Sequence, residues 1–160
     1  MKDRSSVIAF GFVGVQLLLL AAIFLLPGGN DWVAPSWLFT YAGAMQIVGA
    51  ILLGAGMLAL GRSLTALPLP TARSELKTNG IYRFVRHPIY SGLIALTAGG
   101  AIRSSSLEIA AATISLIVWL AIKARWEEAR LRERYPEYEA YAAATPGFIP
   151  FFLRADRLRP

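Results

Sequence analysis

Two long apolar segments without a charged residue limit what this chain can fold into. Residues 7–26 and 37–60 contain no Asp, Glu, Lys or Arg, and Gln16 is the only strongly polar residue of the first segment. A membrane-spanning helix needs about 20 consecutive apolar residues, so each segment is expected to cross a bilayer. The first segment is also longer than the apolar core of a signal peptide, about 7–15 residues, which favours a retained span.

The composition of the 160-residue chain fits an integral membrane protein with a single domain, residues 1–160. Hydrophobic residues make up 56% and charged residues 16% of the chain. In a typical soluble domain about 25% of the residues are charged. The chain has no Cys and one His, which excludes disulfide frameworks, thiolate metal sites and His-rich zinc sites. No metal site is therefore expected.

A third apolar region, residues 89–122, is interrupted by Arg103, three serines and Glu108. A single straight helix of this length would be about 51 Å long and would place the charged interruption inside the roughly 30 Å hydrocarbon core. Two short helices, residues 88–102 and 107–124, joined by a serine-rich turn avoid this problem. The predicted fold is an all-α integral membrane protein with four transmembrane helices, of which the last two form a short hairpin.

The basic residues predict how these spans are oriented. Of the 16 Lys and Arg residues, 15 lie before the first span, between the second and third spans or after residue 122, and Arg103 lies on the opposite side. Because Lys and Arg accumulate on the cytoplasmic side, we expect cytoplasmic N- and C-termini and a cytoplasmic helical cap, residues 125–160. This alternation with apolar spans favours the lipid bilayer over nucleic acid as a partner. The Ala- and Arg-rich composition is compatible with a bacterial inner membrane.

Polar residues that could carry chemistry are concentrated in residues 74–92 and in the segment that begins at Lys123. Both lie on the predicted cytoplasmic side, and the short hairpin brings them together. His87 precedes Pro88, and proline suits the first helical position, so a helix is expected to begin at Pro88. The free N–H groups of its first turn would suit an anion such as a carboxylate or phosphate. The alternative is an interfacial turn whose aromatic and basic residues contact lipid headgroups.

The adjacent acids Glu127 and Glu128 follow the fourth span. Neighbours on a helix point about 100° apart, so at most one of them is expected to face a given pocket. Glu128 is expected to pair with Arg132, four residues later. Glu127 lies nearer the membrane, where an unpaired acid is costly and tends to be functional, so it is the preferred candidate. The alternative is a solvated helix face.

The order of these motifs resembles the isoprenylcysteine carboxyl methyltransferase family, which is itself similar to the membrane phospholipid methyltransferases. The matching residues are Gly80-Ile-Tyr82, Arg86-His-Pro-x-Tyr90-x-Gly92, Glu127-Glu-x-x-Leu131, Tyr135-Pro-x-Tyr138-x-x-Tyr141 and Ile149-Pro150. The resemblance covers roughly the second half of the chain. It implies a small helical bundle with a cytosolic cap over a pocket for S-adenosyl-L-methionine, and methyl transfer from that cofactor.

The resemblance also implies roles for individual residues. The cofactor-binding residues that it implies are Ser74, Glu75, Leu76, Lys77, Tyr82, His87, Pro88, Ile89, Tyr90 and Glu127. The catalytic candidates are Arg86, His87 and Lys123. Lys123 stands where prenylcysteine enzymes carry a substrate-contacting arginine; lysine keeps the charge but lacks the planar fork that grips a carboxylate.

The function expected from these residues is methyl transfer to a lipophilic or membrane-delivered acceptor. The sequence leaves the accepting group open between a carboxylate, a thiol, an amine and a lipid headgroup, and it does not predict the oligomeric state. Two alternatives belong to other classes of protein. One is a nicotinamide-dependent membrane reductase of the steroid-reductase type, and the other is a non-enzymatic membrane scaffold.

Overall fold

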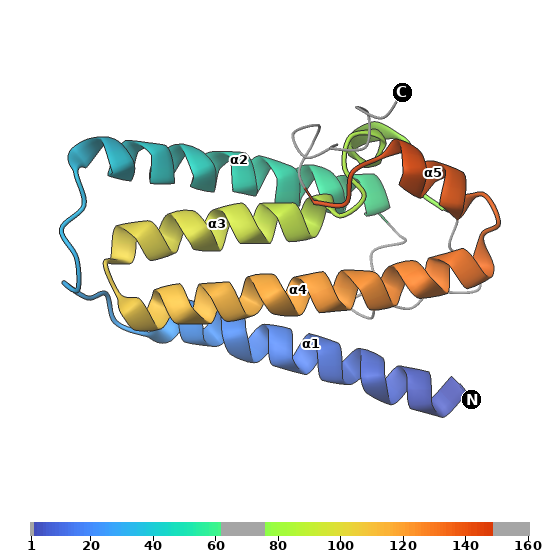
Figure 1. The fold of residues 1–160 in the computed structure, drawn as a ribbon, viewed down its shortest axis with the longest axis horizontal. Coiled ribbons are helices and arrows are strands. Elements are labelled where there is room, and N and C mark those ends of the chain that lie inside the picture. The colour runs from blue at the N-terminus through green and yellow to red at the C-terminus, as the bar shows by residue number, and fades with distance from the viewer. Residues whose placement is uncertain (1, 62–75, 149–160) are drawn as a thin grey trace, which may run out of the picture.

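The computed structural model describes residues 2–61 and 76–148, with side chains from Ser6 onward. Every regular element in this part of the chain is a helix. In chain order these are α1 (Lys2–Leu25), α2 (Ser36–Leu60), the 3-10 helix η2 (Gly80–Arg83), α3 (Pro88–Ser104), α4 (Leu107–Arg134) and α5 (Tyr138–Ala144). The four long helices lie side by side in one bundle, and α5 lies at the end where α4 finishes (Figure 1).

Three of the helical segments are long and apolar enough to cross a membrane, namely Ser6–Leu25, Ser36–Leu60 and Leu107–Arg134. α3 has 17 residues and is about 26 Å long at 1.5 Å per residue. This helix is the short third helix that the sequence predicts, and it is the first of the two helices of the hairpin. The all-helical architecture is therefore confirmed for the described residues.

α2 and α3 pack so closely that their backbones touch at glycines. A Cβ atom built on Gly92 would lie 2.6 Å from the carbonyl oxygen of Gly49, and one built on Gly99 would lie 2.5 Å from that of Ala42. Only residues without a large side chain allow helices to approach so closely, which is a common way of packing helices in lipid. α3 is therefore held against α2 along its length.

The serines of the turn between α3 and α4 provide its left-handed residue and the cap of the next helix. Ser105 adopts a left-handed conformation with φ 49°, and the Ser106 hydroxyl caps α4 by accepting a hydrogen bond from the Ile109 N–H at 3.3 Å. Asp31 of the α1–α2 connection also accepts a hydrogen bond from the Leu107 N–H at 2.8 Å. This end of the hairpin is therefore fixed by capping bonds to α4.

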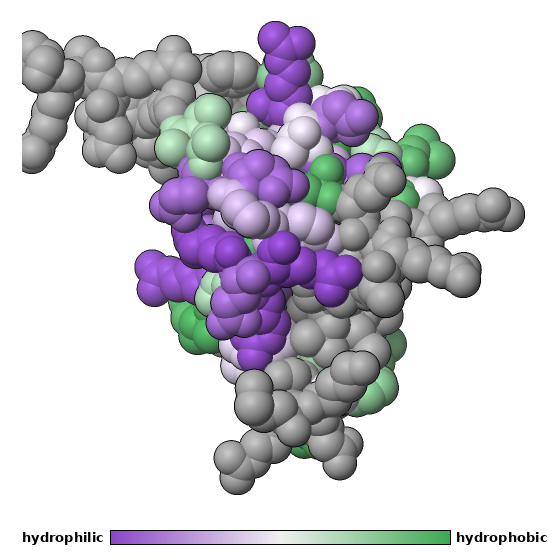
Figure 2. Space-filling model, turned by 90° about the vertical axis from the view of Figure 1, so that its right-hand side faces the viewer, coloured by the Kyte–Doolittle hydropathy of each residue, from purple (hydrophilic) through white to green (hydrophobic). Residues whose placement is uncertain are grey.

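α4 continues beyond the predicted membrane span, residues 107–124, and ends at Arg134. Nothing interrupts it before Pro136, which has no N–H to donate and cannot continue a helix. Glu127 and Glu128 consequently lie on the same rigid helix as the apolar span. Hydrophilic side chains gather at this end of the bundle (Figure 2).

Candidate active site

His87 lies where α3 begins, and its side chain is 8% exposed. It is the N-cap residue of α3 and Pro88 occupies the first turn, as the sequence predicts. Its Nε2 atom lies 2.9 Å from Glu128 Oε1, and its Nδ1 atom lies 4.0 Å from Glu127 Oε2. The imidazole also stacks on Tyr90, with 5.4 Å between the ring centroids. Both acids of α4 therefore approach the same imidazole, one at each ring nitrogen, and the expectation that at most one of them faces a given pocket stays a prediction.

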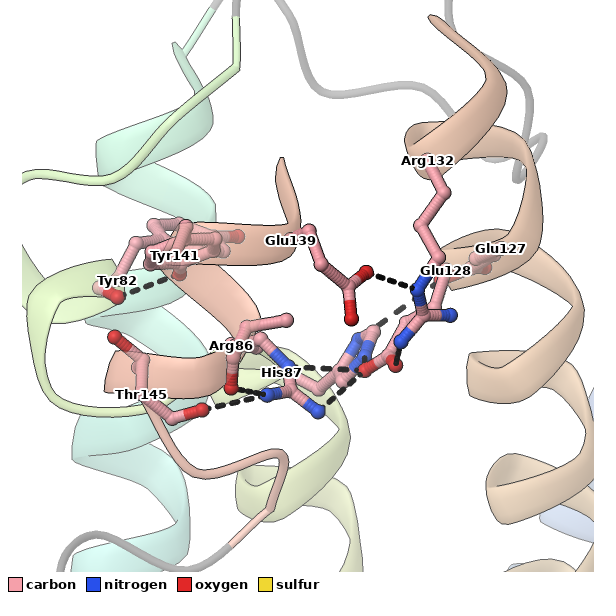
Figure 3. A network of polar contacts seen from close by, with 10 residues as sticks. Tyr82, Arg86, His87, Glu127, Glu128, Arg132, Glu139, Tyr141 and Thr145 are labelled. Carbon is pink, nitrogen blue, oxygen red and sulfur yellow. Dashed lines mark hydrogen bonds and ion pairs between the residues drawn. The ribbon is translucent and has the colours of Figure 1, made fainter. Parts of the chain in front are cut away.

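Glu128 is the centre of a polar network between α3, α4 and the C-terminal segment (Figure 3). Its Oε1 atom lies 3.0 Å from both Nε and Nη2 of Arg86. Its Oε2 atom lies 3.5 Å from Arg132 Nη2, which confirms the pairing expected from their spacing. Arg132 in turn contacts Glu139 at 2.9 Å. With these partners Glu128 holds α4 against the start of α3. Of these contacts the sequence predicts only the one with Arg132.

Arg86 ties the C-terminal segment to the start of α3. Its Nη1 atom donates to the carbonyl oxygens of Ala142 and Thr145, both at 2.6 Å. The backbone N–H groups of Arg86 and His87 donate to the carbonyl oxygens of residues 146 and 147, both at 2.9 Å. These two N–H groups are therefore already used within the chain. Through these contacts Arg86 fixes the C-terminal segment against the start of α3.

Glu127, Tyr90 and Lys123 form a second group on the other side of His87. The Tyr90 hydroxyl donates a hydrogen bond to Glu127 Oε1, and the Glu127 side chain is 15% exposed. The Lys123 ammonium lies 5.1 Å from the centroid of the Tyr90 ring and donates a 2.8 Å hydrogen bond to Gln16 Oε1 on α1. The structure thus brings four of the predicted site residues together: His87, Tyr90, Lys123 and Glu127.

Four of the other predicted cofactor-binding residues lie away from this group or are not described, and Pro88 and Ile89 are next to it in sequence but turn towards α2. Pro88 and Ile89 face α2, since a Cβ atom on Gly56 would lie 3.1 Å and 2.8 Å from their side chains. Leu76 and Lys77 are half-buried at the start of the second described stretch. The predictions for Ser74 and Glu75 fall outside the described residues.

Tyr82 is held in place by the last short helix. It is buried on η2, and its carbonyl oxygen accepts a 2.6 Å hydrogen bond from the Tyr141 hydroxyl. Burial raises the pKa of Tyr82 well above its usual range, and burial raises the pKa of Tyr141 to about 12. Both hydroxyls therefore stay protonated near neutral pH, and that of Tyr141 acts as a hydrogen-bond donor.

Two residues that the sequence analysis does not select complete the picture. Gln16 holds Lys123, and Phe148 stacks on His87 with 5.4 Å between the ring centroids. A polar residue in an otherwise apolar span was the available signal for Gln16, whereas nothing in the sequence marks Phe148. Within residues 2–61 and 76–148 no three His, Cys, Asp or Glu side chains are grouped so that they could hold a metal ion.

Comparisons with known proteins show the family of the chain. Residues 37–138 match the family described as phospholipid methyltransferase. Protein-S-isoprenylcysteine O-methyltransferase B of Arabidopsis thaliana is 31% identical over 139 residues, which cover 82% of this chain and 68% of that protein. The nickel-cobalt-cadmium resistance protein NccN of Alcaligenes xylosoxydans xylosoxydans is also 31% identical, over 86% of this chain and 62% of its own length.

A solved structure shares the fold. The eukaryotic intramembrane Ras methyltransferase ICMT, an isoprenylcysteine carboxyl methyltransferase, superposes with a TM-score of 0.65 at 22% sequence identity. The match covers 94% of this chain but 52% of that one, so this chain spans about half of the solved relative. The resemblance found in the motifs is thus confirmed, and the chain belongs to the phospholipid methyltransferase family.

Proposed function

We propose that this chain transfers a methyl group from S-adenosyl-L-methionine to a lipophilic or membrane-delivered acceptor. Membership of a membrane methyltransferase family supports the reaction class. The observation that supports binding of the cofactor at this site is the contrast between the two neighbouring acids. Glu128 is occupied by Arg86, His87 and Arg132, whereas Glu127 is sheltered and accepts a hydrogen bond from one described donor, the Tyr90 hydroxyl.

The chemistry of this donor set fits the cofactor. S-adenosyl-L-methionine carries an ammonium group and ribose hydroxyls, which are hydrogen-bond donors. A carboxylate with free acceptor positions binds such donors through strong charge-assisted hydrogen bonds. Glu127 would hold one of these groups, and Tyr90 would fix the orientation of its carboxylate. His87 and Tyr90, stacked 5.4 Å apart, would give the site a flat aromatic wall.

The protein's part in the reaction is mainly to position the acceptor. The sulfonium of the cofactor makes its methyl group reactive, so the chain needs to align the attacking atom and exclude water. A carboxylate acceptor needs no base. A thiol or an amine must lose a proton, and His87 is the only histidine of the chain that could accept it. Lys123 would place a positive charge beside the acceptor. Catalytic roles for Arg86, His87 and Lys123 are part of this proposal.

The proposed membrane topology rests on the lengths of the helices and on the distribution of the basic residues. α3 would be a short fourth span beside the three longer helices. Residues 125–160 would form a cytoplasmic cap, and both termini would lie in the cytoplasm, since the basic residues cluster on that side. A bacterial inner membrane is the proposed location. The accepting group remains a choice between carboxylate, thiol, amine and lipid headgroup.

Calorimetry on the purified protein in nanodiscs tests the cofactor. Wild type should bind S-adenosyl-L-methionine, and Glu127→Gln should lose about 1.5–3 kcal/mol of binding free energy, the range for a hydrogen bond to a charged group. Glu133→Gln is the matched control, because Glu133 lies exposed on the same helix. Absence of binding by folded wild type would contradict the proposal, and reduced nicotinamide cofactor is titrated in parallel as the competing hypothesis.

A second experiment identifies the acceptor class. The protein is incubated with methyl-labelled S-adenosyl-L-methionine and three probes: a farnesylated N-acetylcysteine for a carboxylate, an alkanethiol for a thiol, and phosphatidylethanolamine for the amine of a lipid headgroup. Label in one product, absent with Glu127→Gln, assigns the class. Cofactor binding without label in any probe would support the cofactor and exclude these three acceptors.

A further inference from the structure

Lys123 and Glu127 are placed to form an ion pair, yet they do not. They lie four residues apart on α4, the spacing at which side chains of a helix meet. Lys123 is 4% exposed, and in an apolar environment a buried ammonium strongly favours an acidic partner. Nevertheless no ion pair joins these two described side chains. The reason for their separation must lie on a neighbouring helix.

That neighbour is Gln16 of α1. Its Oε1 atom accepts a 2.8 Å hydrogen bond from Lys123 Nζ. The same ammonium lies 5.1 Å from the Tyr90 ring centroid, which stabilises a cation further. Glu127 meanwhile accepts from the hydroxyl at the other end of Tyr90. Gln16 therefore binds the Lys123 ammonium, and Tyr90 contacts both the ammonium and the Glu127 carboxylate. With these partners the two charged groups do not form a direct ion pair.

We propose that Gln16 is a positioning residue that holds the Lys123 ammonium away from Glu127 and so keeps the Glu127 carboxylate free for the cofactor. The inference rests on the proposed function in one respect, namely that Glu127 binds the cofactor. It also explains why α1 keeps a glutamine in an otherwise apolar segment, where a polar side chain is costly unless it is hydrogen-bonded. α1 contributes this hydrogen bond with Lys123 to the site.

Gln16→Met removes the acceptor and keeps the length of the side chain. Lys123 then turns to Glu127 and competes with the cofactor, so the affinity for S-adenosyl-L-methionine should fall about tenfold, which corresponds to about 1.4 kcal/mol. Gln46→Met is the matched control, because Gln46 is the other glutamine of the chain and lies on α2 beside Gly99. Its affinity should equal that of wild type.

The decisive variant is the double substitution Gln16→Met with Lys123→Met. Without an ammonium to capture Glu127, its affinity should return to that of Lys123→Met alone. A glutamine with a merely structural role predicts the opposite, because a second buried substitution would add damage rather than remove it. Unchanged affinity in Gln16→Met, or a double variant that binds more weakly than Lys123→Met alone, would overturn the inference.

A ligand-free measurement separates this inference from the proposed function. A double-mutant cycle of Lys123→Met and Glu127→Gln in thermal unfolding reports the coupling between the two side chains. The coupling should be weak in wild type, where no direct ion pair joins the two side chains, and clearly stronger and stabilising in the Gln16→Met background. If wild type binds no S-adenosyl-L-methionine but the coupling appears, the proposed cofactor is wrong and the diversion of Lys123 stands. If the coupling is the same in both backgrounds, Gln16 does not divert Lys123.

Discussion

Arg86 and Glu128 are 42 residues apart in sequence, and two nitrogens of the guanidinium lie 3.0 Å from the same carboxylate oxygen. Because Arg86 also holds the carbonyl oxygens of Ala142 and Thr145, this pair joins the start of α3, α4, and α5 with the residue that follows it. Both side chains are largely buried, with 16% and 11% exposure. Loss of the Arg86–Glu128 pair should therefore affect the whole site rather than one contact.

Arg86→Met should lower the free energy of unfolding by about 3 kcal/mol, because it leaves a buried Glu128 carboxylate without its main partner. Chemical unfolding in detergent measures the loss. Arg86→Lys should recover only part of it, since an ammonium cannot reproduce the fork that binds the carboxylate and the two carbonyls together. Arg83→Met, an exposed neighbour on η2, is the control. A loss no larger than that of the control would mean that the pair is not a stabilising element.

Tyr90→Phe should weaken binding of S-adenosyl-L-methionine while leaving the fold intact. The ring still stacks on His87, but Glu127 loses the hydroxyl that fixes its carboxylate. A hydrogen bond to a charged group is worth about 1.5–3 kcal/mol, so calorimetry should record a clear loss of affinity. Tyr41→Phe serves as the comparison, because Tyr41 is 66% exposed on α2. Equal affinities of the two variants would argue that Tyr90 does not orient Glu127.

Gly92→Ala should destabilise the bundle, whereas Gly54→Ala should not. The new Cβ atom would lie 2.6 Å from the Gly49 carbonyl oxygen in the first variant and would meet nothing within 4 Å in the second. Overpacking of this kind costs about 1–3 kcal/mol. Thermal unfolding of both variants checks the contrast. Similar unfolding temperatures would show that α2 and α3 can separate without cost.

Unfolding at alkaline pH should depend on Tyr141. Burial raises its pKa from 10.0 to about 12 in the folded protein. Below the unfolded pKa both states keep the proton, so this contribution to stability is fully present there. As the pH rises from 10 towards 12, the unfolded state loses the proton first and the folded state becomes relatively less stable. Tyr141→Phe should flatten the fall of the unfolding temperature in this range, and an unchanged slope would contradict the assignment.

The local parts of this architecture are readable from the sequence. The start of α3 follows from the proline after His87, and the contact of Glu128 with Arg132 follows from a spacing of four residues. In each case the partners are near in sequence, so helix geometry alone brings them together. The apolar runs likewise predict α1 and α2 because length and hydropathy suffice.

The contacts between distant segments could not be predicted in the same way. The distances from Glu128 to Arg86 and from Gln16 to Lys123 depend on how α1 and α4 are rotated about their axes, which no local pattern specifies. The pairing of His87 with a backbone carbonyl of residue 147 leaves no trace in residue type, because any residue supplies a carbonyl. The approach of His87 to both acids could not be predicted from α4 alone, because His87 reaches them from the start of α3.

The glycine contact between Gly49 and Gly92 has a consequence for how such bundles diverge. Where two backbones touch, nearly every substitution is penalised, so the half of the bundle that carries His87 is constrained to one shape. α1 meets α4 through side chains instead, such as Phe12 against Trp119, and these are exchangeable at modest cost. We expect relatives with different acceptors to differ in the residues of α1 and to keep the close packing of α2 against α3. Substrate specificity would then change on the α1 side of the bundle while the α2–α3 pair stays the same.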